Sequence, residues 1–230
     1  MITTGLRRYL GTRRTEIVDV ANGGTCLDLP KFPVRSFGAT GANLQGTPVV
    51  CGGATDVAAL KSCFRFTNGE WEKFAIMKGK RLDAAGVVNN KKLHVFGGYN
   101  DKTRHLQTSE TINIDGEVSD GPDLPTAVYG HAIAAINDTV SILTGGITNV
   151  SHSSSKTWYY NHETEAFTSG PNLLEGRSYH GSAFYVDKVT KSRIPIVTGD
   201  STELLIDGQW QPGTFQTSMQ KAKCSDLLLP

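Results

Sequence analysis

The sequence is short of several features that mark other classes of protein. Its 230 residues hold no unbroken apolar run near 18 residues, so we expect no membrane anchor. Four arginines interrupt the first 17 residues, so we expect no signal peptide either. With 23 basic and 22 acidic residues, the net charge of +1 gives no field that would attract nucleic acid or an anionic membrane. These absences favour a soluble domain and leave its cellular compartment open.

The usual motifs of catalytic and cofactor sites are also missing. There is no glycine-rich phosphate loop, no Ser/His/Asp spacing and no nucleophile elbow. The six histidines are scattered, and no spacing places two or three of them on one strand face as metal ligands. His131 and His180 recur beside glycines, which a repeat explains better than a metal does. We therefore expect no cofactor, no metal and no enzyme activity.

Turn signals, in contrast, are abundant and regular. The chain has 25 glycines and 9 prolines between short runs of Val, Ile, Thr and Phe, a composition typical of many short strands. Asn-Gly or Asp-Gly dipeptides favour hairpin turns in which both central residues take positive φ. Such pairs, with Asn161-His162 filling one gap, begin at residues 22, 68, 115, 161 and 207, at spacings of 46, 47, 46 and 46. A structural unit of about 46 residues therefore repeats five times.

Other positions keep the same period. The strands that enter these turns carry Glu16, Cys63, Glu110, Trp158 and Glu203. The strands that leave them carry Cys26, Trp71, Val118, Phe167 and Trp210. Upstream of each turn, an apolar strand ends in small residues, which form the doublets Gly52-Gly53, Gly97-Gly98 and Gly145-Gly146 in the three middle units. Only glycine allows the sharp turn and the close backbone approach expected at such a strand end.

This pattern resembles the kelch repeat, in which an apolar strand closes on a Gly-Gly doublet and a Trp follows an Asn-Gly or Asp-Gly turn. The likeness spans nearly the whole chain. The first unit has Thr4-Gly5 and the last has Gly199-Asp200 in place of the doublet, and Cys26 and Val118 stand where an aromatic residue is usual. The resemblance implies a fold, the β-propeller, and does not by itself imply an activity.

We therefore predict an all-β, kelch-type β-propeller of five four-stranded blades that forms one domain over residues 1–230. The expected units are residues 1–34, 35–80, 81–126, 127–176 and 177–217. In the second unit we expect strands at 37–44, 47–52, 62–67 and 70–76. A four-stranded sheet cannot bury both of its faces alone, so successive sheets must stack around a common axis.

Two ways of completing the ring stay open. The chain begins at the second strand of a unit, and residues 218–230 follow Trp210 at the offset of a first strand. If that segment pairs into the first blade, five blades close without an open inner edge. Alternatively, the chain is part of a six- or seven-bladed propeller, the sizes most common in the family that it resembles.

Cys51 and Cys63 are the cysteines placed for a bond. The chain has four cysteines and no C-x-x-C motif. Cys51 ends one expected strand and Cys63 opens the next, so the two side chains could face each other across a hairpin. A disulfide and a pair of buried thiols are equally compatible with this placement.

Arginines recur just before the first strand of several units. Arg35, Arg81 and Arg177 hold this place, with Tyr129 at the fourth. Such arginines can bridge to Glu16, Glu110 or Glu203 and tie neighbouring strands together. The kelch resemblance implies a second role, because in peptide-binding members an arginine here lies on the rim of the ligand face. These four residues would then grip a carboxylate or an acidic segment.

The loops between the second and third strands should lie at the same end of the sheets as those arginines. The third unit offers Tyr99, Asn100, Arg104 and His105, and the fourth contains His152. Variable polar loops on a rigid scaffold are common recognition sites, although simple solvated linkage explains them equally well.

The resulting hypothesis is a non-catalytic module that binds a protein or peptide partner, with an acidic segment as the expected ligand, at the loop face of the ring. The alternative is a carbohydrate-binding or sugar-modifying kelch-like propeller enzyme.

Overall fold

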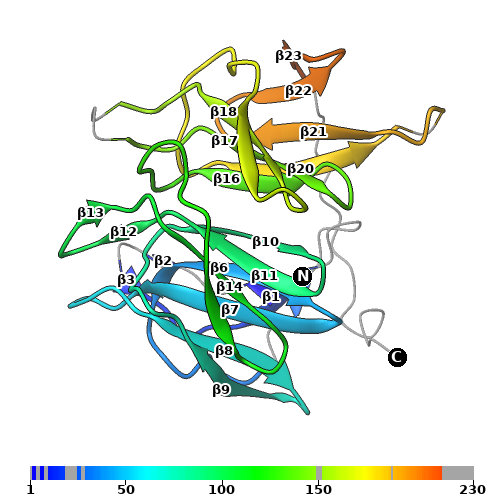
Figure 1. Cartoon of the computed structure of the whole chain (residues 1–230). Coiled ribbons are helices and arrows are strands. Elements are labelled where there is room, and N and C mark those ends of the chain that lie inside the picture. Colours follow the sequence, from blue (N-terminus) through cyan, green and yellow to red (C-terminus); the bar gives the residue numbers. More distant parts are fainter. Residues whose placement is uncertain are drawn as a thin grey trace.

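The protein folds into strands joined by turns and loops. Figure 1 shows the computed structural model, which describes residues 2–3, 6–7, 10–18, 25–26, 29–148, 152–187 and 189–213. Over these ranges the chain contains no helix. Consequently none of the described residues belongs to a helix with the length and apolar character needed to cross a bilayer. The predicted all-β class is confirmed.

The strands form antiparallel sheets whose order follows the chain. Four sheets have four strands each: β6 (Phe37–Leu44), β7 (Thr47–Ala54), β8 (Ser62–Thr67) and β9 (Glu70–Ile76); β10 (Ala85–Asn89), β11 (Lys92–Phe96), β14 (Ser109–Ile112) and β15 (Val118–Gly121); β16 (Ala132–Ala135), β17 (Val140–Thr144), β18 (Thr157–Asn161) and β19 (Ala166–Ser169); β20 (Gly181–Val186), β21 (Arg193–Thr198), β22 (Thr202–Ile206) and β23 (Gln209–Pro212). A three-stranded sheet precedes them, made of β1 (Ile2–Thr3), β4 (Glu16–Val18) and β5 (Thr25–Cys26). Two short hairpins pair β2 (Leu6–Arg7) with β3 (Leu10–Gly11), and β12 (Tyr99–Asn100) with β13 (Arg104–His105).

The strands expected in the second unit agree closely with the structure. β6, β8 and β9 have the expected bounds, and β7 continues two residues further, to Ala54. Between β8 and β9, Asn68 and Gly69 have φ of 50° and 80°. Asp207 and Gly208 have φ of 50° and 76°. Both pairs therefore take the positive φ that the type I′ hairpin requires.

Two other turns keep the spacing but not the turn type. Four residues separate β18 from β19, and the Asn161 side chain accepts hydrogen bonds from the amides of Glu163 and Thr164 at 2.9 and 3.0 Å. Before β15, Asn113 caps its turn in the same way. Residues 22–23 lie outside the described ranges. The repeat period thus reflects the spacing of the strands, and an Asx side chain supports a turn where the dipeptide does not.

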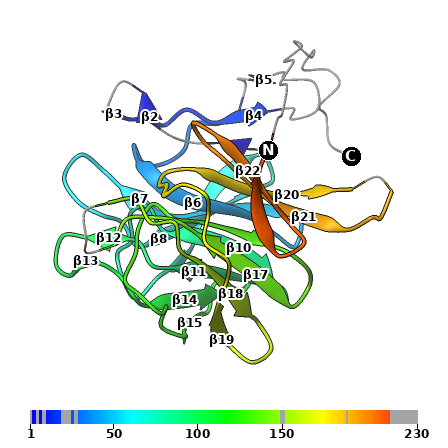
Figure 2. The ribbon, with the colours of Figure 1, turned by 90° about the horizontal axis from the view of Figure 1, so that it is seen from above.

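The first strands of the four larger sheets lie side by side around a shared axis. β6 contacts β10, β10 contacts β16, and β16 contacts β20 (Figure 1). An open pocket of about 310 Å³ is lined by three consecutive residues from each of these strands, namely 41–43, 86–88, 133–135 and 182–184. Figure 2 shows the structure from above, where β11, β14 and β15 follow one another away from the inner strand β10. The four sheets therefore lie next to one another in chain order, an arrangement compatible with a β-propeller.

The core of the protein lies between successive sheets. Leu44, Val49 and Met77 of the second unit pack against Leu93 and Val95 of the third. Similar clusters join the third sheet to the fourth around Phe96 and Tyr160, and the fourth to the fifth around Ile142, Val197 and Trp210. Burying each large apolar side chain contributes about 1.5–3 kcal/mol. Burial between sheets, as expected from the repeat, is what stabilises the stack.

The glycine doublets fasten each sheet to the next through main-chain atoms. The second glycine of each doublet donates its N–H to a carbonyl at the start of the following unit: Gly53 to Arg81, Gly98 to Val128 and Gly146 to Arg177, each at 2.8 Å. The first glycine has φ of 69°, 58° and 63° in the same order, and a Cβ there would clash with that carbonyl oxygen. Glycine is thus required for both the turn and the close approach.

These bonds correct the register expected for the arginines. Because they place Arg81, Val128 and Arg177 at one repeat position, Tyr129 lies one residue after it. In the second unit the amide of Ser36 donates to the carbonyl of Thr12, as the amide of Arg81 does to that of Leu60. Ser36 therefore holds this position, and Arg35 lies one residue before it. The predicted set of Arg35, Arg81, Tyr129 and Arg177 therefore mixes three repeat positions, because residue counts do not reveal how many residues each linker contains.

Candidate binding face

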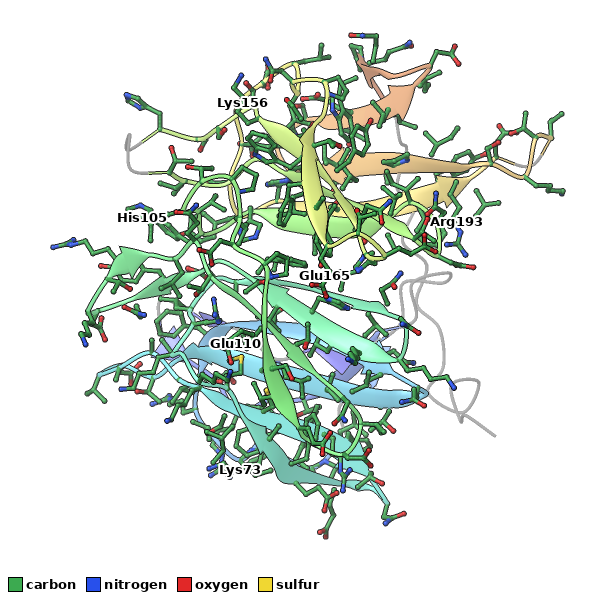
Figure 3. The ribbon with its side chains drawn as sticks, in the orientation of Figure 1. Lys73, His105, Glu110, Lys156, Glu165 and Arg193 are labelled. Carbon is green, nitrogen blue, oxygen red and sulfur yellow. A yellow bond between two sulfur atoms is a disulfide. The ribbon has the colours of Figure 1, made fainter. Side chains whose placement is uncertain are left out.

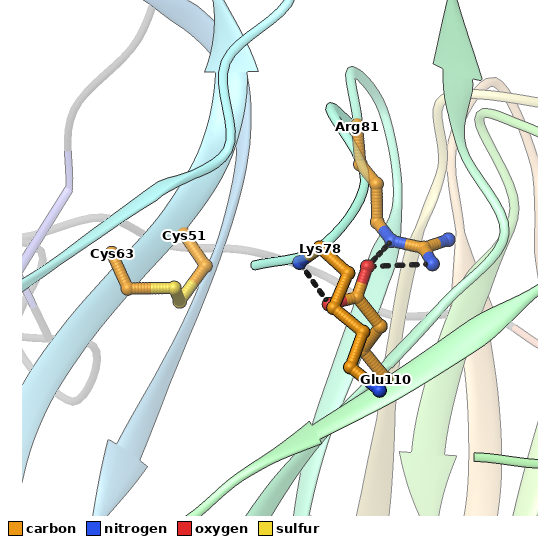
Figure 4. The surroundings of a disulfide bond; sticks show 5 residues. All are labelled: Cys51, Cys63, Lys78, Arg81 and Glu110. Carbon is orange, nitrogen blue, oxygen red and sulfur yellow. Dashed lines mark hydrogen bonds and ion pairs between the residues drawn. A yellow bond between two sulfur atoms is a disulfide. The ribbon is translucent and has the colours of Figure 1, made fainter. Parts of the chain in front are cut away.

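Arg81 and Arg177 are buried, so neither lies on an exposed rim. Arg81 is 2% exposed, and its guanidinium bonds the Glu110 carboxylate at 2.9 and 3.1 Å and the carbonyls of Gly97 and Thr108 at 2.9 and 2.7 Å (Figure 4). Arg177 is 9% exposed and pairs with Glu203. The structure thus favours the bridging role for these two arginines, since both guanidinium groups are buried and paired with a glutamate.

Each of these glutamates also holds the linker that leads to its arginine. Glu110 accepts hydrogen bonds from the amides of Lys78 and Gly79 at 2.7 and 2.9 Å. Glu203 accepts them from the amides of Leu174 and Glu175 at 2.8 and 3.3 Å. The carboxylate therefore fixes the chain as it passes from one sheet to the next. This satisfies the buried charge and the free amides together.

Arg35 is exposed, and its Nε donates to the carbonyl of Gly11 at 2.8 Å. It therefore ties the segment before β6 to the last residue of β3. Of the four residues expected to form a ligand ring, only Tyr129 joins the cluster described next.

An aromatic cluster forms where the linkers before the inner strands meet the loops after the second strands. Backbone bridges join Leu82 to Tyr99 and Tyr129 to Ile147, so both kinds of segment lie at the same end of the sheets, as expected. The rings of Tyr99, His105 and Tyr129 lie 5.0–6.1 Å apart. Figure 3 shows His105 at the β12–β13 hairpin, away from the sheet that contains Glu110. The predicted residues Tyr99, His105 and Tyr129 are thus brought together.

Tyr179 extends this cluster and was not identified from the sequence. Its ring lies 6.2 Å from that of Tyr129, and its side chain is 63% exposed. It leans over Gly130, where a Cβ would stand 3.3 Å from the ring. We call Tyr99, His105, Tyr129, Tyr179 and Asp83 the axial cluster. Partly exposed aromatic side chains in mutual contact are typical of recognition surfaces.

Main-chain hydrogen bonds position the axial cluster at the head of the inner strands. The amide of Asp83 donates to the carbonyl of Gly38, that of Gly130 to Asp83, and that of Tyr179 to Gly130, at 2.7–2.9 Å. All four residues have left-handed φ, between 53° and 61°. This conformation suits Gly38 and Gly130, whereas for Asp83 and Tyr179 it costs roughly 1 kcal/mol each. Strain of this kind at a surface aromatic residue is a recognised sign of a functional site.

Asp83 carries the charge of the cluster. Burial raises the pKa of its carboxyl to about 6, and the nearby Tyr179 hydroxyl offsets part of that rise. Burial, followed by the charge of Asp83, raises the pKa of Tyr179. Among the described residues no ion pair includes Asp83. The site therefore combines a carboxylate that lacks a counter-ion with exposed tyrosine rings.

The other predicted residues lie at the edge of the cluster or apart from it. Asn100 pairs with Arg104 across the β12–β13 hairpin, and its side chain caps that turn through the amides of Lys102 and Thr103. Arg104 is exposed, with φ of 63°. His152 is exposed in the loop between β17 and β18, beside residues outside the described ranges. Hence Asn100 shapes the hairpin, whereas His152 is not drawn into the cluster.

Cys51 and Cys63 face each other across β7 and β8, with Cα atoms 4.1 Å apart, and a disulfide joins them. The bond lies within one sheet, near the buried Arg81–Glu110 pair (Figure 4). The core cluster around it contains no residue of the axial cluster. The disulfide stabilises the blade and has no direct part in the binding face.

The buried histidines occupy positions set by the repeat. His131 lies over Gly97, and His180 lies over Gly145 and bonds the Thr144 hydroxyl at 2.8 Å. Burial lowers the pKa of His131 to about 3 and that of His180 to about 4. In the described part of the chain, no three His, Cys, Asp or Glu side chains are grouped so as to hold a metal ion.

Comparison with known proteins identifies one informative relative. No protein-family model matches the chain. Alpha-scruin from Limulus polyphemus is similar to it. The two sequences are 25% identical over 219 residues, which cover 86% of this chain and 23% of alpha-scruin. The chain thus spans less than a quarter of the length of this relative. Because alpha-scruin is a kelch-repeat protein, the similarity supports the resemblance drawn from the glycine doublets.

Proposed function

We propose that the protein is a non-catalytic interaction module that binds a segment of a protein partner at the axial cluster. The observation that carries this proposal is the contiguous set of partly exposed rings of Tyr99, His105, Tyr129 and Tyr179. Tyrosine offers a large contact area with little loss of side-chain entropy, and so it is enriched in the centres of binding surfaces. The similarity to a kelch-repeat protein fits such a module.

The positions of the rings suit an extended peptide. The β12–β13 hairpin supplies Tyr99 and His105, and the linkers before β16 and β20 supply Tyr129 and Tyr179. Main-chain bonds hold the linkers, and Asn100 braces the hairpin turn. A surface built from fixed segments loses little entropy when a ligand binds.

We also propose that the five sheets are the blades of one propeller. The sequence of contacts from β6 to β10, β16 and β20 and the open pocket between them support this arrangement. The strand expected to close the ring, within residues 218–230, lies outside the described residues. The rival proposal of a larger propeller predicts further blades beyond these five, and low-resolution imaging of the natural protein would count them.

Selection from a randomised peptide display library tests the binding function. We expect immobilised wild-type protein to enrich peptides with a shared pattern, and Tyr99→Ala combined with Tyr129→Ala to weaken their binding at least about thirtyfold, because one central tyrosine commonly contributes about 2 kcal/mol. Tyr185→Ala, which removes an exposed tyrosine from β20, is the matched control and should bind normally.

Equal binding by the double variant, with its melting temperature unchanged, would remove the axial cluster from the proposal. A glycan array tests the alternative function in parallel, because tyrosine rings also stack on sugars. Selective retention of a glycan without enrichment of any peptide would favour the carbohydrate-binding alternative.

A further inference from the structure

The half-buried carboxylate of Asp83 has a different environment from the buried carboxylates of Glu110 and Glu203. Glu110 and Glu203 each bond an arginine and two backbone amides. The hydroxyl of Tyr179 is the side-chain group that lowers the pKa of Asp83, and none of the ion pairs formed by the described residues includes Asp83. A neutral hydroxyl does not balance the negative charge of a partly buried carboxylate. A cation from outside the chain would satisfy it.

The surroundings of Asp83 favour one class of cation. The Tyr179 ring lies beside the carboxylate and is largely exposed, and the rings of Tyr129, Tyr99 and His105 follow within 5.0–6.2 Å of one another. Aromatic faces attract lysine and arginine head groups, and their edges pack against the methylene stems of these side chains. A carboxylate at one end of an aromatic surface therefore matches a basic side chain in both charge and shape.

The backbone holds both groups in a costly conformation. Gly38 and Gly130 take left-handed φ freely at two of the four equivalent positions, whereas Asp83 and Tyr179 adopt φ of 53° and 54° at the others. In this conformation the Asp83 carboxyl lies against Gly38 and the Tyr179 ring against Gly130, and the two linkers are joined through the main chain of Gly130. Folding alone gains little from that arrangement, because the carboxylate it positions has no counter-ion. A bound cation would supply that counter-ion and so offset the cost of the strained conformation.

We propose that Asp83, together with the rings of Tyr179 and Tyr129, binds the cationic head of a lysine or arginine side chain presented by the partner protein. This inference rests on the proposed interaction function and specifies its ligand. It also replaces the expectation of an acidic ligand at this point, because Arg81 and Arg177, which would have held an acid, are already engaged inside the blades.

The test uses peptides selected on the full 230-residue wild-type chain from a randomised display library. We expect the selected peptides to share a lysine or arginine. Replacing that residue with norleucine, which keeps the stem and removes the charge, should weaken binding at least about tenfold. This arm leaves the protein unchanged, so folding of a variant does not affect it.

Variants of the protein provide the second arm. Asp83→Asn should weaken binding of the selected peptide by a similar factor. The norleucine replacement should then reduce binding to this variant little further, because the two changes remove the same contact. Asp101→Asn, an exposed acid on the neighbouring β12–β13 turn, is the control and should bind as wild type does. Binding to wild type should also weaken as the pH falls below about 6, where Asp83 becomes protonated.

The outcomes separate this inference from the proposed function. Enriched peptides without a shared basic residue would overturn the cation site and leave the interaction function standing. The same conclusion would follow if the norleucine replacement weakened binding to Asp83→Asn as much as it weakens binding to wild type. Selection of no peptide at all would count against the interaction function itself and against the cation site with it.

Discussion

At the scale of single residues, one pair of contacting repeat positions is filled in two chemically different ways. Arg81 pairs with Glu110, and Arg177 with Glu203, whereas the equivalent fourth-unit residues are Val128 and Trp158. Both solutions satisfy the buried site, the first through charge and amide bonds and the second through apolar packing. This agrees with the general finding that a buried ion pair and a well-packed apolar set can be of similar stability.

Asp83 leads to a prediction at this scale, because its ionised carboxylate lowers the stability of the folded protein. Burial raises its pKa from 3.8 to about 6, so the ionised carboxylate is disfavoured in the folded protein relative to the unfolded chain. A raised carboxyl pKa lowers stability above about pH 6, and the loss disappears as the pH falls toward 4. After allowance for solvent screening, we expect Asp83→Asn to raise the free energy of unfolding by about 1 kcal/mol at pH 7.5.

Urea denaturation at pH 7.5 and near pH 4.5 measures this effect, and the gain should shrink at the lower pH. Asp207→Asn is the matched control, since Asp207 is exposed and has nearly the same left-handed φ, of 50°. A gain of equal size in the control would assign the effect to the backbone preference of asparagine, and no gain in Asp83→Asn would contradict the cost assigned to its charge.

At the scale of elements, the disulfide joins the two central strands of the second sheet. Cys51 and Cys63 are separated by 12 residues, and their bond limits the freedom of the β7–β8 connection in the unfolded chain. For a loop of this size the bond stabilises the fold by roughly 2–3 kcal/mol. We expect Cys51→Ala combined with Cys63→Ala to lower the free energy of unfolding by about that amount. The double variant should still bind the selected peptides, because the core cluster around the bond contains no residue of the axial cluster.

Guanidinium denaturation of the two proteins measures the difference, with peptide binding as the second readout. Loss of binding by a folded double variant would show that the second sheet positions the cluster. Unchanged stability would show that the bond does not form in solution.

The strands themselves followed from the sequence, because turn dipeptides and alternating apolar residues act locally. The bounds of β6, β8 and β9 were predicted residue for residue. The arginine register was not, because it depends on which carbonyl each glycine doublet bonds in the next sheet. Tyr179 was missed for a related reason: its equivalence to Gly130 and Asp83 emerges only once that register is known.

At the scale of the whole molecule, buried and half-buried histidines should make stability depend on pH. Burial lowers the pKa of His94, His162 and His180 to about 4 and that of His131 to about 3. A histidine with a lowered pKa contributes stability that is fully present above about pH 6.5 and is lost as the pH falls toward the folded-state value. His131, which is 7% exposed, should alone contribute a loss of about 3 kcal/mol between pH 6.5 and pH 4.

Urea denaturation across that pH range measures the slope. His131→Ala introduces the residue found at the equivalent positions 39 and 84, and it should flatten the slope even if it lowers stability at every pH. His152→Gln removes an exposed histidine and should leave the slope as it is in wild type. A slope that does not change in His131→Ala would show that this imidazole becomes protonated without opening the blade interface.

The main-chain bonds of the glycine doublets have a consequence for how such a protein diversifies. Gly53, Gly98 and Gly146 attach each blade to its neighbour through a carbonyl, which every amino acid possesses. Side chains at positions 81, 128 and 177 can therefore differ from arginine to valine without detaching one blade from the next. New surface loops can be acquired on an unchanged frame, which makes the β12–β13 segment a natural place to graft a different specificity.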